Sequence, residues 1–140
     1  MWIYQGREFT EEQIGENYGF VYQITNRATN KKYIGKKFFW STRTLPPLKG
    51  KTRRRKKKVM SDWMDYYGSN EELKLLVEKQ GTDFYYREIL ILCKTKGECS
   101  YMEAKLQFEN DVLLRDDYYN EFIGCKIHSS HVRNLKDDYT

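Results

Sequence analysis

The sequence has no apolar run that approaches the length of a membrane-spanning helix, and its first residues lack the apolar core of a secretory signal peptide. It has only two histidines and three cysteines, with no Cys-x-x-Cys pair. Cys125, His128 and His131 could form half of a zinc site, but no fourth ligand stands at a matching spacing. We therefore expect a soluble, intracellular protein with buried reduced thiols and no membrane partner.

The length of 140 residues corresponds to one domain, so we expect a single unit over residues 1–140. Aromatic residues make up 16% of the chain, a composition that excludes a disordered tail. A chain of this size can bury one modest hydrophobic core. The net charge is only +5, so the chain as a whole favours a polyanionic partner weakly.

The positive charge is concentrated in one segment. Between positions 51 and 58, seven of eight residues are cations, namely Lys51, Arg53, Arg54, Arg55, Lys56, Lys57 and Lys58. Pro46, Pro47 and Gly50 precede them and indicate a loop, so we expect a basic loop insertion over residues 44–60. Such a loop would contact nucleic-acid phosphates, which gives affinity without sequence specificity. The alternative is a solvated arm.

The distribution of apolar, turn and capping residues predicts the secondary structure. We expect an N-terminal extension over residues 1–17 with a helix start at Thr10, strands over 19–25, 31–35 and 84–93, and helices over 71–79 and 98–114. The first two strands would form a hairpin around the turn at residues 26–30. This order predicts a small α/β or α+β fold.

Two short motifs stand in the strands of the predicted hairpin. They read Phe20-Val21-Tyr22 and Tyr33-Ile34-Gly35, and the two tyrosines are eleven positions apart. Packing of ordinary aromatic residues across a hairpin would explain tyrosines in both strands. However, the pair resembles the signature of the GIY-YIG nuclease superfamily: the second half is intact and the first half departs conservatively from Gly-Ile-Tyr.

Further residues extend this resemblance over about residues 18–122. Arg43 stands where the family has an arginine, Glu103 or Glu109 can supply its helical glutamate, and Asn120 its asparagine. The family's histidine has no match, because position 47 is a proline. The segments 61–69 and 118–120 also resemble small endonucleases of bacteriophages. The implied fold is a small central antiparallel three-stranded sheet flanked by helices.

The resemblance implies a metal-dependent DNA endonuclease that hydrolyses phosphodiester bonds with Mg²⁺ or Mn²⁺. One carboxylate can suffice for Mg²⁺, which retains several water ligands. We expect Glu103 to be the metal ligand rather than Glu109, because it lies at the edge of the apolar helical stripe. A role in homing or in degradation of host DNA would fit a phage protein acting in the bacterial cytoplasm.

The resemblance also assigns roles to the other matching residues. Tyr22 would act as general base or position the attacking water, and Tyr33 would orient that water or contact the phosphate. Cations at Lys37 and Arg43 would favour the phenolate form of the tyrosines and hold the phosphate. Gly35 would admit the nucleic-acid backbone, and Asn120 would brace the site.

A second interpretation is a non-catalytic nucleic-acid-binding module on a degenerate nuclease fold. The presence of two candidate glutamates favours the enzyme. Neither interpretation identifies the DNA target. A single active centre cuts one strand per event, so a double-strand cut would require a homodimer or two successive events.

Overall fold

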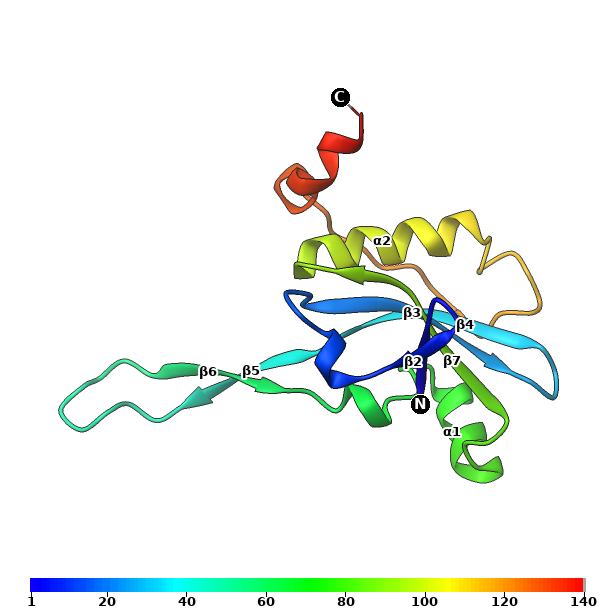
Figure 1. Cartoon of the computed structure of the whole chain (residues 1–140), viewed down its shortest axis with the longest axis horizontal. Helices are drawn as coiled ribbons and strands as arrows, with labels where there is room; N and C mark the ends of the chain where they lie inside the picture. Colours follow the sequence, from blue (N-terminus) through cyan, green and yellow to red (C-terminus); the bar gives the residue numbers. More distant parts are fainter. Residues whose placement is uncertain (140) are drawn as a thin grey trace.

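The computed structural model describes residues 1–139 (Figure 1). Its elements follow in the order β1 (Trp2–Tyr4), β2 (Arg7–Phe9), η1 (Glu11–Gln13), β3 (Gly19–Asn26), β4 (Lys31–Phe38), β5 (Trp40–Leu45), β6 (Arg55–Met60), η2 (Trp63–Asp65), α1 (Glu71–Gln80), β7 (Tyr85–Cys93), α2 (Lys96–Glu109) and η3 (Ser129–Tyr139). The elements labelled η are 3₁₀ helices.

A five-stranded mixed sheet forms the centre of the molecule, with the strand order β2-β1-β7-β3-β4. The three predicted strands β3, β4 and β7 pair in antiparallel orientation, and β3 lies between the other two. Strand β1 pairs with β7 in parallel and with β2 in antiparallel orientation. The mixed α/β fold therefore agrees with the prediction, but the predicted count of three strands was too small.

The two additional strands come from the segment that was expected to be an N-terminal extension. Trp2 is buried, and its indole Nε1 donates a hydrogen bond of 2.7 Å to the backbone oxygen of Trp63. Phe9 is buried against Phe39 and Trp63. These aromatic side chains make the segment part of the sheet and core. Thr10 does start a helical turn, which is the short η1.

The hairpin of β3 and β4 has the register that the sequence pattern requires. Tyr22 pairs with Gly35, and Ile24 pairs with Tyr33. Because side chains alternate along a strand, Tyr22 and Tyr33 project from the same face of the sheet. Their ring centroids are 6.2 Å apart.

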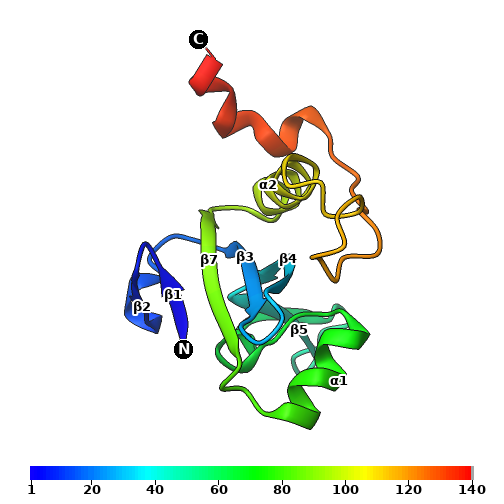
Figure 2. The same cartoon turned by 90° about the vertical axis from the view of Figure 1, so that its right-hand side faces the viewer.

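One helix covers each face of the sheet, and Figure 2 shows α1 and α2 on opposite sides of it. The face that carries Tyr22 packs an aromatic core that includes Trp2, Phe20, Phe39 and Trp63. The other face packs against α2 through a smaller core that includes Val21, Ile34 and Cys99. Strand β3 is therefore buried on both sides along most of its length.

The helices begin and end for local reasons. Helix α1 matches the prediction: the Asn70 side chain accepts a hydrogen bond from the Leu73 N–H, and Gly81 follows the last turn with φ = 86°. Helix α2 begins two residues before the predicted start, at Lys96, and ends at Glu109 rather than at 114. Asp111 has φ = 50°, a left-handed conformation that cannot continue a right-handed helix.

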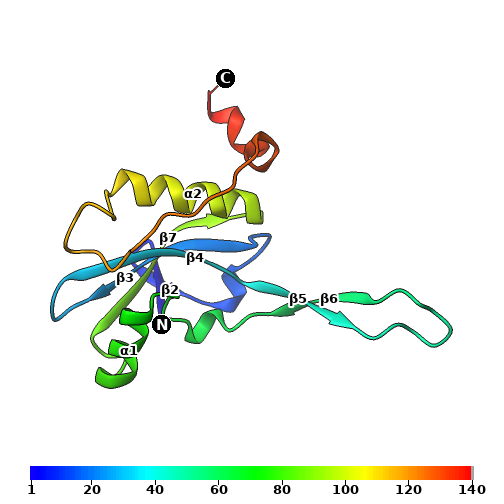
Figure 3. The ribbon, with the colours of Figure 1, turned by 180° about the vertical axis from the view of Figure 1, so that it is seen from behind.

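The two ends of the segment predicted to be a basic loop belong to a second antiparallel sheet. Strands β5 and β6 pair from Trp40 opposite Met60 to Leu45 opposite Arg55. Figure 1 and Figure 3 show this two-stranded ribbon projecting away from the body of the molecule. The connection between its strands contains the two prolines and Gly50, whose φ of 80° suits a turn.

Two further expectations concern cysteines and membranes. Cys93 and Cys99 are buried free thiols as expected, whereas Cys125 is exposed. Among residues 1–139, no helix is both long and apolar enough to cross a membrane.

Candidate active site at the edge of strand β4

A pocket of about 490 Å³ lies beside β4, the edge strand of the main sheet. Its lining comes from β4, the start of α1, the middle of α2 and the segment after α2: Tyr33, Lys36, Ser69, Asn70, Glu71, Glu103, Gln107, Asn120, Glu121, Phe122 and Gly124. Three of the predicted site residues, Tyr33, Glu103 and Asn120, are thus brought together from distant parts of the sequence.

Asn120 braces the pocket by closing the edge of β4. Its side chain accepts a hydrogen bond from the Ile34 N–H (3.1 Å) and donates one to the Ile34 carbonyl (2.8 Å). The Gln107 amide donates a second hydrogen bond to the same carbonyl (2.9 Å). These side chains replace the missing neighbouring strand and fix the position of β4 relative to α2.

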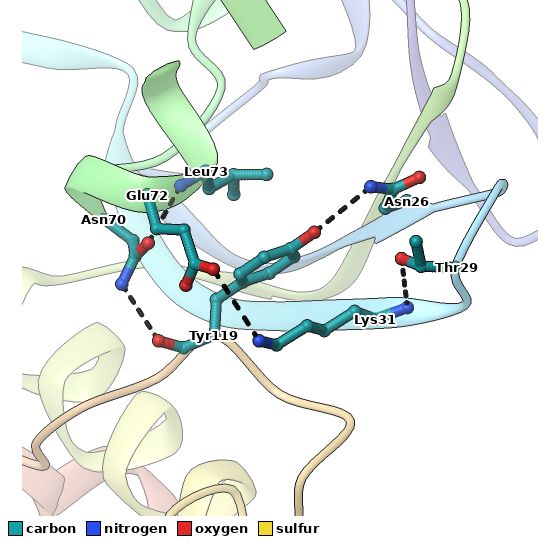
Figure 4. A network of polar contacts seen from close by, with 7 residues as sticks. All are labelled: Asn26, Thr29, Lys31, Asn70, Glu72, Leu73 and Tyr119. Carbon is teal, nitrogen blue, oxygen red and sulfur yellow. Dashed lines mark hydrogen bonds and ion pairs between the residues drawn. The ribbon is translucent and has the colours of Figure 1, made fainter. Parts of the chain in front are cut away.

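A polar network holds the segment before Asn120 in place (Figure 4). The Asn26 amide donates to the Tyr119 hydroxyl, and the Asn70 amide donates to the Tyr119 carbonyl. The Lys31 ammonium lies 4.7 Å from the centroid of the Tyr119 ring and 3.9 Å from a Glu72 carboxylate oxygen. The network ties this segment to the β3–β4 hairpin and to the start of α1, so three walls of the pocket are positioned together.

Glu103 projects from α2 into the pocket with its side chain only 15% exposed. Its Oε1 atom lies 3.3 Å from the ammonium of Lys36. Burial raises the pKa of the Glu103 carboxyl, and Lys36 opposes this through its ammonium and its backbone N–H. Glu109, the alternative in the sequence, is exposed in the last turn of α2. The structure therefore places Glu103, and not Glu109, beside Tyr33.

The two motif tyrosines differ in access to the pocket. Tyr33 lines it, and its hydroxyl lies 3.0 Å from the hydroxyl of Ser69. Tyr22 is only 1% exposed and packs against the rings of Trp2 and Tyr66. Burial raises the pKa of both tyrosines, and Tyr22 is raised well above its usual value. The expectation that nearby cations favour their phenolate forms is therefore not supported.

Gly35 has a different role from the one expected of it. A Cβ atom at this position would lie 2.5 Å from the Tyr22 hydroxyl oxygen and 2.9 Å from a ring carbon of Tyr33. The space beside Gly35 is thus filled by the two tyrosines rather than left open for a nucleic-acid backbone. Gly68, with φ = 92°, is the second glycine close to the Tyr22 hydroxyl.

The two expected cations lie outside the pocket lining. Lys37 faces the aromatic core side, where its ammonium lies 2.6 Å from an Asp62 carboxylate oxygen and 4.1 Å from the Tyr66 ring centroid. Lys37 correspondingly lowers the pKa of Asp62. Arg43 is exposed on β5, opposite Lys57 in the projecting ribbon. The structure does not bring Arg43 to the tyrosines and Glu103.

Sequence reasoning missed several polar residues of the pocket, among them Lys36, Ser69 and Gln107. Lys36 could have been identified from strand alternation, because it shares a face with Ile34 and that face meets the helix of Glu103. Ser69 lies in the segment noted for its resemblance to phage endonucleases, next to the predicted helix cap. Gln107 lies one helical turn after Glu103, and hence on the same face of α2.

Glu103 is a pocket residue that could hold a divalent cation. Among the described residues, no group of three or more His, Cys, Asp or Glu side chains is arranged to hold a metal. A dedicated cage is not needed for Mg²⁺, which binds one or two carboxylates and completes its shell with waters and substrate phosphate oxygens. A water molecule occupies about 30 Å³, so the pocket has room for the ion, its waters and a phosphodiester. The donor set fits Mg²⁺ or Mn²⁺.

Comparison with known protein families identifies the family of this chain. A family model described as "Putative endonuclease segE, GIY-YIG domain" matches residues 2–123. No curated protein and no solved structure matches the chain. The matched region contains the whole main sheet, both α helices and every lining residue of the pocket except Gly124.

Proposed function

The chain belongs to the SegE-type GIY-YIG family of endonuclease domains, and from this premise we propose that it is a divalent-metal-dependent endonuclease that hydrolyses phosphodiester bonds of DNA at the pocket beside β4. The observation that carries the proposal is the convergence of Tyr33, Lys36 and Glu103 in one pocket. A carboxylate, an ammonium and a hydroxyl are the groups needed to bind a cation, a phosphate and a water.

Glu103 is the proposed metal ligand, with Mg²⁺ or Mn²⁺ as the ion. When bound, the ion would polarise the scissile phosphate and stabilise the charge that develops on the leaving oxygen. Lys36 lies within reach of the same space, so its ammonium can contact a phosphate oxygen while it stays close to Glu103. The positive charge of Lys36 also keeps the half-buried carboxylate more acidic than burial alone would allow.

Tyr33 is the proposed contact to the attacking water or the phosphate. Its hydroxyl faces Ser69 in the pocket, and the two hydroxyls can donate and accept hydrogen bonds in turn. Burial raises the pKa of Tyr33, which favours its neutral phenol form. We therefore assign it to orienting the water and donating a hydrogen bond, not to removing a proton as a phenolate.

Tyr22 is proposed to be a positioning residue that acts through Tyr33. Its ring packs against that of Tyr33, and its hydroxyl lies in the space that Gly35 and Gly68 leave open. Trp2, Phe20 and Tyr66 surround it. Tyr22 thereby fixes the relative positions of β4 and the turn that precedes α1, which carry Tyr33 and Ser69.

Phosphate contacts by the basic ribbon are the proposed source of affinity for DNA. We propose that one pocket nicks one strand per event, so a double-strand cut requires a second copy of the chain or a second event. The test is conversion of supercoiled plasmid with Mg²⁺, with Mn²⁺ and with EDTA. Nicked product that depends on the metal supports the nuclease. Salt-sensitive binding without cutting, across several DNA substrates, would favour the non-catalytic binding module.

A further inference from the structure

The β5–β6 ribbon carries a charge distribution unlike that of the rest of the molecule. Residues 41–61 contain nine of the 25 Lys and Arg residues and no Asp or Glu. The remaining chain therefore has 16 basic residues against 20 acidic residues. The projecting ribbon is a concentrated positive element on a body that is slightly negative.

The cations lie on both faces of the ribbon. Directly paired residues of an antiparallel ribbon share a face, and successive pairs alternate between faces. The pairs Thr42–Lys58 and Thr44–Lys56 define one face, whereas Arg43–Lys57 and Leu45–Arg55 define the other. Beyond its base the ribbon has no apolar face that could pack on a protein. A partner that presents negative charge on two opposing sides would pair with the cations on both faces of the ribbon.

The base of the ribbon is fixed to the strand that forms the active site. Only Phe39 separates β4 from β5, and its side chain is fully buried in the aromatic core. On the return strand, the Ser61 hydroxyl donates a hydrogen bond of 2.6 Å to the Phe38 carbonyl, and the Ser61 N–H donates to the Phe39 carbonyl. The Lys58 ammonium lies 4.4 Å from the Trp40 ring centroid. The ribbon therefore continues β4 as an anchored extension.

We propose that the ribbon enters the major groove of B-form duplex DNA and positions the β4 pocket on a phosphate of the same duplex. This inference rests on the proposed DNA endonuclease function. The major groove is about 12 Å wide and admits a two-stranded ribbon, and its two walls are rows of phosphates. Cations on both faces of the ribbon match these two walls. The major groove of duplex RNA is deep and narrow, so the ribbon cannot enter it.

The distance from the pocket to the ribbon predicts the length of DNA that the protein covers. Thr44 stands eleven positions after Tyr33, which at about 3.3 Å per residue corresponds to about 36 Å. One turn of B-form DNA is about 34 to 36 Å. The ribbon should therefore cover up to about one helical turn, on one side of the cleaved phosphate only.

The experiment measures binding without cleavage. A full chain with Glu103→Gln is titrated in EDTA against a labelled 30-base-pair DNA duplex, the same sequence as duplex RNA, and one of its single strands. We expect the DNA duplex to bind at least tenfold more tightly than the other two. Dimethyl sulfate should then show protection of guanine N7, which lies in the major groove, and not of adenine N3 in the minor groove. Equal affinity for RNA duplex or single strand, or protection of adenine N3 alone, would overturn the proposal.

Charge variants test the two faces separately. Lys56 and Lys57 are adjacent and exposed but lie on opposite faces, so Lys56→Gln and Lys57→Gln should each weaken duplex binding several-fold. Each should also reduce the slope of log K against log salt by about 0.9. Lys79→Gln, on the exposed face of α1, is the matched control and should change neither. An effect of only one of the two ribbon lysines, or of neither, would contradict insertion between two phosphate walls.

Failure of the ribbon inference can be distinguished from failure of the proposed nuclease function. A wild-type chain that binds duplex DNA through the ribbon but cuts no DNA would reject the nuclease and leave the ribbon inference standing. A wild-type chain that cuts plasmid, with no effect of Lys56→Gln or Lys57→Gln on binding, would reject the ribbon inference alone.

Discussion

The hydroxyl of Tyr22 occupies the space where a side chain at Gly35 would begin. A Cβ atom built on Gly35 would lie 2.5 Å from the hydroxyl oxygen and 2.8 Å from the ring carbon that bears it. The two residues face each other directly in the register of β3 and β4. The glycine of the second motif is thus a steric complement of the tyrosine of the first.

This relationship predicts the effect of Gly35→Ala. The added methyl group must displace the Tyr22 ring, which is buried on all sides, so we expect a loss of about 1 to 3 kcal/mol in the free energy of unfolding. Cleavage should fall as well, because Tyr33 lies against the same position. Urea unfolding measures the first effect. Gly124→Ala is the control for the unfolding measurement only, because a Cβ there would make only ordinary contacts with Phe122. Equal stability of Gly35→Ala and wild type would refute the steric complement.

The tyrosines themselves should respond differently to removal of their hydroxyls. Tyr33→Phe removes a hydroxyl that lines the pocket, and we expect cleavage to fall by about 10²-fold or more with little change in stability. Tyr22→Phe removes a hydroxyl from a buried site, and we expect a smaller loss of cleavage. Single-turnover rates and urea midpoints of both variants separate these effects. If Tyr22→Phe abolished cleavage as fully as Tyr33→Phe at unchanged stability, Tyr22 would contact the reacting atoms.

Burial of Tyr22 also predicts a dependence of stability on alkaline pH. Its pKa in the folded state is raised, so the neutral form is favoured and the folded chain resists deprotonation. The contribution of neutral Tyr22 to the free energy of unfolding should be fully present below the unfolded pKa of about 10. It should be lost as the pH rises above that value, because the unfolded chain then releases a proton that the folded chain retains. In Tyr22→Phe this part of the decline should disappear. Thermal melts between pH 8 and pH 11 provide the measurement, and parallel curves for the two proteins would argue against the buried phenol.

The wild-type protein should be less stable at neutral pH than the Glu103→Gln variant, in which a neutral amide replaces the carboxylate. Burial raises its pKa in the folded state, so deprotonation is easier in the unfolded chain. As the pH rises from 4 to 7, the carboxylate increasingly favours unfolding. We therefore expect Glu103→Gln to gain stability relative to wild type over this range, with little difference at pH 4. Denaturant midpoints at both pH values check this, and a difference that shrinks as the pH rises would contradict it.

Arg87 supports the aromatic core on the face of the sheet that carries Tyr22. Its guanidinium lies between the rings of Trp2 and Tyr67 and donates hydrogen bonds to the carbonyls of Met64 and Tyr66. Lysine cannot reproduce this planar set of donors, so Arg87→Lys should cost about 2 to 4 kcal/mol of stability. It should also expose the 62–69 segment to proteolysis. Arg27→Lys is the control, since Arg27 is exposed beside Tyr86. Comparable stability losses in the two variants would count against this support.

The sequence predicted those parts of the fold that depend on local patterns. Alternation and turn residues gave the β3–β4 hairpin, and Asn70 and Gly81 marked the ends of α1 to within one residue. The N-terminal strands were missed because only tertiary contacts, chiefly burial of Trp2 and Phe9, hold so short a segment in a sheet. The ribbon was interpreted as a loop because Pro46, Pro47 and Gly50 indicate a turn there, and its strands lack the alternating apolar pattern that would have marked them.

The candidate site was predictable to a similar degree. The tyrosines and Asn120 could be named from their motif order, which left Glu103 and Glu109 as alternatives until the helical stripe favoured Glu103. The structure places Tyr33, Glu103 and Asn120 around one pocket. The roles of Gly35 and Lys37 depend on which face of β4 meets which core, and that requires the packed structure. Arg43 was assigned by its spacing along the chain, but the ribbon that follows Phe39 carries it away from the pocket.

The most direct test of the proposed active site is single-turnover cleavage of a DNA duplex in Mg²⁺ by Glu103→Gln and Glu109→Gln. Both substitutions remove one carboxylate from α2, but only Glu103 lies in the pocket. We predict that Glu103→Gln lowers the rate by at least 10³-fold while Glu109→Gln retains the wild-type rate. Cleavage that persists in Glu103→Gln, or is lost only in Glu109→Gln, would contradict an active site beside β4.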